Sequence, residues 1–285
     1  MKPARSTVGV VLFGGVVAML SPPAVAQEAL GLDHIPLVVR DLEVARTRFI
    51  ELGFALKPGR DHTNGIRNLH VKFPDGAGIE LLTASRALDP LSTQYMELLR
   101  AGEGPAFVSL HARDTPKLQA ALKAGGYEFR QEGELTELRR PELSYLFFVR
   151  DNRSPNDRPE HFAHPNGAKA LGAVWIAPED DEALVRLLVQ LGGTQRRQQV
   201  WAPDPVEATI VSLPGGEIFI LPKRHQLLAG RPVIGASFRV PDLSAVRRTL
   251  AKAKIEPWRG TGTTNRVVVA PNIALGLWLE FRTGP

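Results

Sequence analysis

The stretch GLDHIPLVVRDLEVARTRFIELGFALKPGRDHTNGIRNLHVKFPDGAGIELLTA, residues 31–84, decides the fold. It opens with apolar residues at positions 35, 37 and 39 that alternate with positions 34, 36 and 38, a pattern typical of a strand. A helix is predicted next, because Asp41 can cap its start, apolar residues recur at helical spacing and Gly53 can end it. Apolar runs at Leu69–Phe73 and Ile79–Leu82 around a Gly-rich turn predict a hairpin. We therefore expect a strand, a helix and three strands, which we call a βαβββ module.

The polar residues of these strands are the first candidates for a binding site. If the apolar residues face the helix, then His34, His70 and Glu80 point to the opposite face. A buried carboxylate is costly unless it is paired or coordinated, so Glu80 either binds a metal or forms a salt bridge to Lys72 or Arg67. An imidazole and a carboxylate together suit Zn, Fe, Mn, Ni or Co, and the residues do not select among these metals.

The motifs of this stretch resemble the vicinal oxygen chelate (VOC) superfamily, in particular its glyoxalase-like domain proteins. The resemblance rests on Leu32-Asp33-His34-Ile35-Pro36, on Val39-Arg40-Asp41-Leu42 and on Gly78-Ile79-Glu80-Leu81. It implies that paired βαβββ modules form an open barrel around a divalent metal, which chelates two adjacent oxygens of the substrate. It also implies His34 and Glu80 as metal ligands. The superfamily includes isomerases, epimerases, extradiol dioxygenases, thiol transferases and drug-binding proteins, so the resemblance leaves the reaction open.

The strand–Asp–helix–Gly pattern recurs three more times, which makes the chain a tandem repeat. The further copies begin at Phe107, Ala173 and Gly235. We therefore predict an α+β fold in which tandem βαβββ modules form two glyoxalase/bleomycin-resistance-like open barrels, here called the first and second cups. The predicted domains are residues 30–167 and 168–285, because turn residues at 164–167 precede the third module.

The four copies differ in the residues at the two ligand positions. Counting back seven residues from each capping Asp gives His34, Phe107, Ala173 and Gly235 on the first strands. Matching the last strands of the first, third and fourth modules gives Glu80, Ile220 and Glu280. Only the first module carries both donors. We therefore expect the second cup to be metal-free and to act as a scaffold, an interface or a shape-selective lid.

A third metal donor is expected from the second module, since a catalytic metal site normally uses about three protein donors. The segment 158–166 holds a carboxylate and two imidazoles, and we expect it to run as the final strand of that module. The candidate ligands are Glu160, His161 and His164. Alternation places Glu160 and His164 on one face and His161 on the other, without showing which face points inward.

His70 and His111 are the candidates for moving a proton during catalysis. His70 shares the face of Glu80, and His111 lies on the face of Phe107 at the expected rim of the cup. The alternative for His70 is an ordinary half-exposed strand residue. For His34 the alternative is a structural histidine bonded to the backbone.

Residues 1–26 read as a signal peptide, because a basic start and the apolar run Val8–Leu20 precede the small-residue site Ala24-Val25-Ala26. The run is shorter than the roughly 20 residues that span a bilayer, so we expect a periplasmic or secreted protein without a stable membrane anchor. The sequence has no cysteine, so no disulfide or thiolate ligand is available. The formal net charge of +5 comes from scattered residues, which argues against a nucleic-acid partner. A homodimer stays open.

The predicted function is that of a divalent-metal-dependent enzyme acting on a small molecule with vicinal oxygens. Lyase or isomerase chemistry and extradiol dioxygenase chemistry are both considered. Glyoxalase-type isomerisation needs glutathione, a mainly cytosolic thiol, and fits an exported protein poorly. A dioxygenase would use His34, Glu80 and a second histidine, His161 or His164. The family's dioxygenases usually carry that histidine on the first strand of a later module, where this chain has none. The competing interpretations are a periplasmic small-molecule binding protein of the same fold and a chain that acts through protein contacts.

Overall fold

The computed structural model describes residues 30–150, 153–260 and 265–284. The predicted signal peptide, residues 1–26, lies outside the described residues. Within the described ranges, no helix is both long and apolar enough to cross a membrane.

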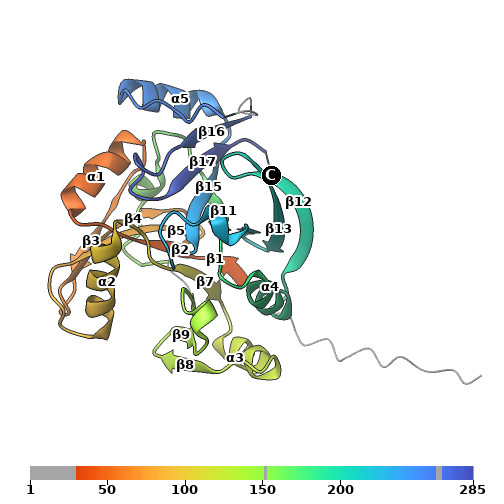
Figure 1. The fold of residues 1–285 in the computed structure, drawn as a ribbon. Helices are drawn as coiled ribbons and strands as arrows, with labels where there is room; N and C mark the ends of the chain where they lie inside the picture. The colour runs from red at the N-terminus through yellow and green to blue at the C-terminus, as the bar shows by residue number, and fades with distance from the viewer. Residues whose placement is uncertain (1–29, 151–152, 261–264, 285) are drawn as a thin grey trace, which may run out of the picture.

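The first module forms as the sequence predicts (Figure 1). Its elements are β2 (His34–Val38), α1 (Leu42–Glu51), β3 (Lys57–Asp61), β4 (Ile66–Lys72) and β5 (Gly78–Ala84). The carboxylate of Asp41 accepts hydrogen bonds from the first backbone N–H groups of α1, which fixes the start of the helix. The strands lie in the order β3-β4-β5-β2, so the last strand runs parallel beside the first. This closure brings residues of β2 and β5 together.

The second module repeats this topology and joins the first along one edge. It consists of β7 (Val108–Ala112), α3 (Thr115–Ala124), β8 (Phe129–Glu132), β9 (Leu135–Leu138), η1 (Pro141–Leu143) and β10 (Leu146–Val149), in the sheet order β7-β10-β9-β8. Strand β1 (Leu30–Leu32) pairs with β7, and β6 (Gly104–Pro105) pairs with β2. Backbone hydrogen bonds from Asp33 to Ser109 and from Ala106 to Pro36 continue the pairing between them. The segment 30–38 therefore runs antiparallel along 104–112 and ties the two modules into one cup.

The third and fourth modules share one seven-stranded sheet. Their elements are β11 (Ala170–Ile176), α4 (Asp181–Gln190), β12 (Thr194–Trp201), β13 (Pro205–Leu213), β14 (Gly216–Ile220), β15 (Val233–Arg239), α5 (Leu243–Lys252), β16 (Arg266–Val269) and β17 (Trp278–Arg282). The order is β12-β13-β14-β11-β15-β17-β16, with β11 and β15 antiparallel at the junction. The sheets stay open, and the predicted α+β fold of open-barrel modules is confirmed.

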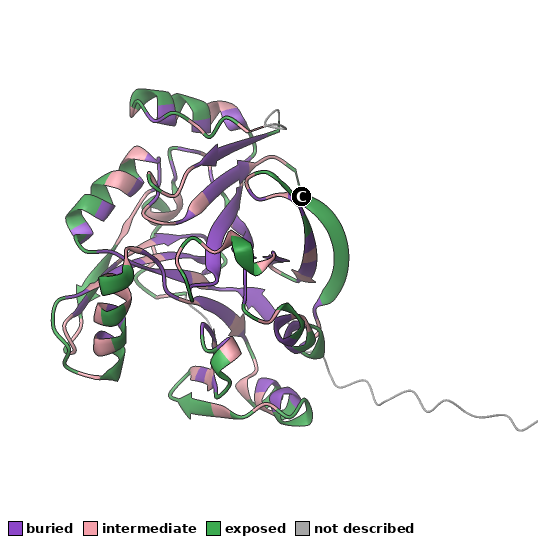
Figure 2. Ribbon diagram, in the orientation of Figure 1, coloured by how far each residue is buried: buried purple, intermediate pink, exposed green. Residues whose placement is uncertain are grey.

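One apolar core connects all four modules on the helix-facing sides of the sheets. Phe54 of the first half packs against Phe238 and Phe281 of the second, with ring centroids 5.1 and 5.8 Å apart. Figure 2 shows the inner strands buried and β12, at the edge of the large sheet, exposed. Figure 1 shows α1, α3, α4 and α5 on the outside of the sheets. The opposite, concave faces of the sheets form the two cups.

Arg231 joins the second half to the helix that covers the first cup. This helix, α2 (Pro90–Ala101), was not predicted, although Asp89 and Ser92 form a capping box at its start. The buried Arg231 guanidinium donates hydrogen bonds to the carbonyls of Gly102 (2.8 Å) and Pro105 (2.8 Å) just after the helix. Carbonyl groups at a helix C-terminus favour a cation. Arg231 thereby positions α2 from the other half of the molecule.

Candidate functional site

His34 and Glu80 meet inside the first cup, where the closing of β2 against β5 places them. The Nε2 atom of His34 lies 3.4 Å from Oε2 of Glu80. The Nδ1 atom of His34 is bonded to the carboxylate of Asp33, which is buried. Asn68 donates a hydrogen bond of 2.6 Å to the other oxygen of Glu80. The imidazole is thus held by one carboxylate and aimed at a second one.

The two side chains form an ion pair whose charges depend on each other. Burial alone would lower the pKa of His34, but hydrogen bonds and charge from Asp33 and Glu80 raise it to about 10. Burial would raise the pKa of Glu80, but the hydrogen bond and charge of His34 lower it to about 2. In the metal-free protein His34 is therefore cationic and Glu80 anionic at neutral pH.

A polar cavity of about 430 Å³ opens on one side of this pair. It is lined by His34 and Glu80 together with Lys57, Arg60, His62, Asn68, His70 and Lys72. His70 lies directly across from Glu80 in the β4–β5 ladder. Burial lowers the pKa of His70 to about 4, although the charge of Glu80 acts in the opposite direction. His70 is therefore neutral at pH 7 and lines the cavity beside Glu80.

An apolar cavity of about 420 Å³ opens on the other side and also includes His34 and Glu80. Its wall comes from the second module, through Phe107 and Phe147, and from Leu91 and Tyr95 of α2. The ring of Phe147 lies 5.7 Å from the ring of His34 in an edge-on arrangement. The first cup therefore has a polar half and an aromatic half, with the His34–Glu80 pair between them.

The strand register shows which residues replace ligands in the second module. In the first module Glu80 pairs with Pro36, the residue two places after His34. In the second module the residue two places after Phe107 is Ser109, and Ser109 pairs with Phe147. Both ligand positions of that module are thus phenylalanines. Among the residues that the structure describes, no group of three or more His, Asp or Glu side chains is placed to hold a metal. The first cup offers the two donors of the first module.

The segment 158–166 is not the final strand of the second module, and this prediction was wrong. The final strand is β10, while residues Pro159–Phe162 form the short 3₁₀ helix η2, which packs against β4. Glu160 is exposed and lies 3.8 Å from Arg158. His161 accepts a hydrogen bond of 3.1 Å from the backbone N–H of Arg158. Neither lines the cavities beside His34 and Glu80.

His164, the last candidate donor of that segment, is a structural residue. Its Nδ1 accepts a hydrogen bond from the N–H of Ala55 and its Nε2 donates one to the carbonyl of Lys72, both at 3.0 Å. The ring packs edge-on against Phe54 and Phe73. Burial lowers its pKa to about 4. With both nitrogens in use, His164 has no free position for a metal.

His111 lies away from the His34–Glu80 pair. Its ring covers Gly31, where a Cβ atom would meet the His111 ring at 2.1 Å, and its Nδ1 lies 3.3 Å from the carbonyl of Leu32. It does not line either cavity of the first cup. The close approach explains the need for glycine at position 31, and His111 holds β1 against β7.

In the second cup, other side chains occupy or engage the positions that correspond to the metal ligands. The register places Phe219, not the expected Ile220, at the position that corresponds to Glu80. Gly235 leaves room for Trp175, since a Cβ there would lie 2.4 Å from the indole. The indole donates to Ser237 (2.8 Å), and the Ser237 hydroxyl donates to Glu280 (2.6 Å). Glu280 is also paired with Arg266 at 3.2 Å, so both of its oxygens have protein partners.

Several residues of the first site were not singled out from the sequence. Asp33 precedes His34 in the quoted motif, and an acidic residue next to a candidate ligand could have indicated their hydrogen bond. Asn68 shares the strand face of His70. Phe147 and Tyr95 reach the site only through the pairing of modules and the docking of α2. No local pattern in the sequence reveals these last two.

A family model described as a glyoxalase-like domain matches residues 32–192. No curated protein matches the chain. Among solved structures, a 4-hydroxymandelate synthase mutant from Streptomyces coelicolor is 12% identical with a TM-score of 0.64, covering 90% of this chain and 93% of that chain.

Two other solved structures give a similar result. The 2,3-dioxygenase LapB from Pseudomonas sp. KL28 is 13% identical with a TM-score of 0.60, covering 90% of this chain and 93% of that one. A hypothetical protein from Staphylococcus aureus is 14% identical with a TM-score of 0.59, covering 90% and 100%. At these identities the structures show a shared fold and leave the activity open. Because the family model matches more than half of the chain, the protein belongs to the glyoxalase-like domain family of the VOC superfamily.

Proposed function

We propose that the first cup binds a divalent metal through His34 and Glu80 and acts as an enzyme on a small molecule with two adjacent oxygens. The observation that carries this proposal is the Asp33–His34–Glu80 arrangement inside an open cavity. A metal-ligating histidine usually gives its second ring nitrogen to a carboxylate, as His34 does to Asp33. The similarity to the solved structures of a 2,3-dioxygenase and a 4-hydroxymandelate synthase supports this class of function at the level of the fold.

The two donors fit a divalent ion as part of its coordination shell. His34 and Glu80 both line the cavity, and their Nε2 and Oε2 atoms, 3.4 Å apart, are close enough to share one ion after small movements. The remaining positions would belong to water or to the bound molecule. Such an ion would hold two substrate oxygens and stabilise the negative charge that develops on them.

The protein side chains around the pair position the substrate and move its proton. Phe107 and Phe147 offer a flat apolar wall, and Tyr95 of α2 helps to exclude water from it. His70, beside Glu80 and neutral at pH 7, is placed to accept a proton from the bound molecule. The cup thus favours a molecule with an apolar or aromatic body and a polar, oxygen-bearing end.

Export to the periplasm or the medium is part of the proposal and is supported by the pattern of residues 1–26. An exported enzyme has little access to glutathione, which favours lyase or dioxygenase chemistry over thiol-dependent isomerisation. The intact mass of the chain purified from its native compartment would show whether the segment has been removed.

A second candidate function is metal-free capture of the same class of small molecule. It is favoured by the second module, which places phenylalanines at both ligand positions. In this case the His34–Glu80 ion pair itself would bind the polar end of the ligand.

Metal analysis separates the two functions. The full chain, purified without chelator or affinity metal, is compared by mass spectrometry with a His34→Ala/Glu80→Ala variant and with His111→Ala as a matched control. We expect about one metal per chain in the wild type and the control and almost none in the double variant. Absence of metal from all three proteins would contradict the enzyme proposal and leave the metal-free binding protein.

A further inference from the structure

The second cup keeps a charged cavity that the proposed function does not use. The cavity has a volume of about 310 Å³ and opens on the concave side of the seven-stranded sheet. It adjoins the apolar cluster of that cup, with which it shares Val200, Ile210 and Phe219. Its size is at the lower end of the range for small-molecule sites.

Charged side chains from four strands line this cavity. They are Arg196 of β12, Glu217 of β14, Arg266 of β16, and Glu280 and Arg282 of β17. Three guanidinium groups face two carboxylates, so the lining has one excess positive charge. Arg266 and Arg282 are direct cross-strand partners, and like charges in such a position repel each other.

Both carboxylates are already fully engaged by the protein. One oxygen of Glu217 accepts a hydrogen bond of 2.6 Å from Arg196, and the other accepts one of 3.3 Å from Arg282. One oxygen of Glu280 accepts a hydrogen bond from Arg266, and the other accepts one from Ser237. The Nε atom of Arg282, in contrast, is buried without a hydrogen-bond partner among the described residues. Arg196 and Arg282 share the one carboxylate of Glu217, so this pair of arginines carries one positive charge that the described residues lining the cavity do not balance.

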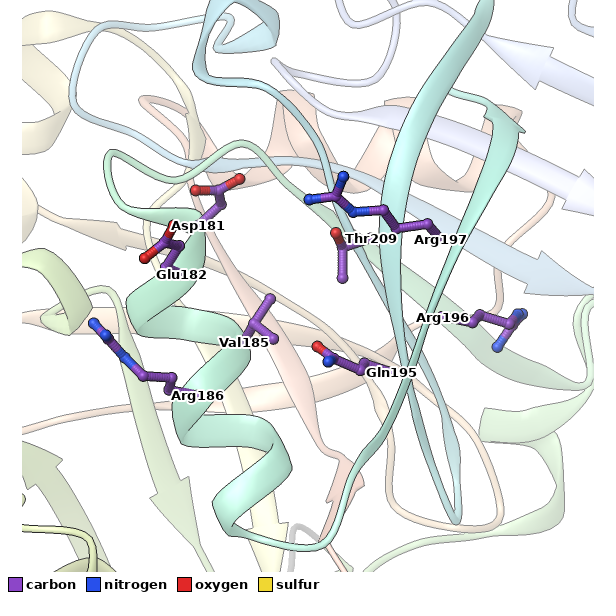
Figure 3. Close-up of a pocket in the computed structure, with 8 residues that line it drawn as sticks. All are labelled: Asp181, Glu182, Val185, Arg186, Gln195, Arg196, Arg197 and Thr209. Carbon is purple, nitrogen blue, oxygen red and sulfur yellow. The ribbon is translucent and has the colours of Figure 1, made fainter.

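The two faces of β12 show that this charge excess is particular to the cup. Arg196 and Arg197 are neighbours in the chain and point to opposite sides of the strand, Arg197 towards α4 and Arg196 away from it (Figure 3). A cavity of about 510 Å³ on the α4 side is lined by Asp181, Glu182 and Arg186 of the helix and by Arg196 and Arg197 of β12. The Arg196 side chain points away from α4 (Figure 3), so the charged groups on that side of the strand are two carboxylates and two guanidiniums.

Aromatic rings hold two of the arginines in place. The guanidinium of Arg266 lies 4.9 Å from the ring centroid of Trp201, and that of Arg282 lies 5.5 Å from that of Phe219. Such stacking orients the planar group for bidentate binding of a carboxylate. Ile210 and Val200 offer apolar surface beside it. One excess charge matches a monoanion better than a phosphate, which carries up to two charges near pH 7.

We propose that the second cup binds a small organic monocarboxylate, with its carboxylate at Arg282 and Arg196 and its carbon skeleton on Ile210 and Phe219. The site is independent of His34 and Glu80 and of any metal. It would make the protein a carrier or sensor of such acids in addition to the function of the first cup.

Calorimetric titration of the full chain tests the proposal with acetate, benzoate, phenylacetate and inorganic phosphate at constant ionic strength. Benzamide serves as the uncharged counterpart of benzoate. We expect one equivalent of a carboxylate to bind, benzamide to bind at least tenfold more weakly, and phosphate to bind more weakly than the best carboxylate. Failure of all three carboxylates, or tighter binding of phosphate, would overturn the proposal.

Three variants locate the site. Arg196→Gln lies on an exposed edge strand, so it should fold normally and weaken carboxylate binding at least tenfold, as should Arg282→Gln. Arg197→Gln on the other side of the strand is the matched control and should bind as the wild type does. The His34→Ala/Glu80→Ala variant should also bind normally. Loss of binding in that variant, or unchanged binding in both Arg196→Gln and Arg282→Gln, would place the ligand elsewhere.

Discussion

The two cups use the same strand position for a glutamate and treat it in opposite ways. In the second cup the Glu280 side chain is 5% exposed, is paired with Arg266 and accepts a hydrogen bond from Ser237. In the first cup Glu80 is 18% exposed, pairs with His34 and lies between two open cavities. A guanidinium stays charged at any relevant pH, whereas an imidazole can lose its proton and become a ligand. The comparison teaches that the partner of the carboxylate, not the carboxylate itself, separates a glutamate held by a fixed charge from one whose partner can titrate.

The largest expected effect tests this difference in stability. Glu280→Gln should lower the free energy of unfolding by about 3 kcal/mol, because it leaves the buried charge of Arg266 without its counterion. Glu80→Gln should cost about 1 kcal/mol, since its site is partly solvated and His34 keeps Asp33. Urea unfolding of the two matched variants measures both values. An equal loss, or a larger one for Glu80→Gln, would contradict the conclusion that Glu280 is the more tightly integrated of the two glutamates.

A smaller loss of stability should appear on acidification. Six of the seven histidines belong to the first half, and one of them, His164, is buried. The buried His164 stays neutral in the folded protein down to a pKa of about 4, while the unfolded chain takes up a proton near pH 6.5. The stability that this residue contributes above pH 6.5 is therefore lost as the pH falls towards 4.

Between pH 7 and pH 5 this loss amounts to about 2 kcal/mol. The His164→Gln variant has no imidazole at this position. Its unfolding free energy should therefore fall by about 2 kcal/mol less than that of the wild type between pH 7 and pH 5. His161→Gln, three residues earlier and less buried, is the control and should keep the wild-type slope. If all three proteins show the same pH dependence, the buried histidine does not titrate as described.

The smallest effect sharpens the comparison by adding a donor to the first cup. Phe147 stands at the register position of Glu80, with its ring 5.7 Å from that of His34. Phe147→His should tighten zinc binding by at least tenfold, about 1.4 kcal/mol, because it supplies a third ligand. Phe219→His makes the same change in the second cup and should gain nothing, since Arg266 and Ser237 hold Glu280. Competition with a chromophoric chelator measures both, and a gain in the second cup would refute the comparison.

The local part of the first site was predictable, whereas its second wall was not. Alternation on β2 and β5 placed His34 and Glu80 on one face, and parallel closure of the module brings them within 3.4 Å. The prediction for 158–166 was wrong because alternation over a few polar residues is weak, and Pro159 favours the start of a helical turn over a strand. The strand β10 already pairs with β7 and β9, in the place where this segment was expected to run.

The sequence by itself determined the repeated module, its capped helices, the first-strand positions, and the last-strand positions of the first and fourth modules, because these depend on periodicity and short-range hydrogen bonds. It also showed that only the first module has both donors. The tertiary structure alone decided that Phe147 and Tyr95 face His34, that Arg231 positions α2, and that Arg266 closes on Glu280. Those contacts join residues far apart in the chain, and their geometry follows from how modules pack, which no local pattern specifies.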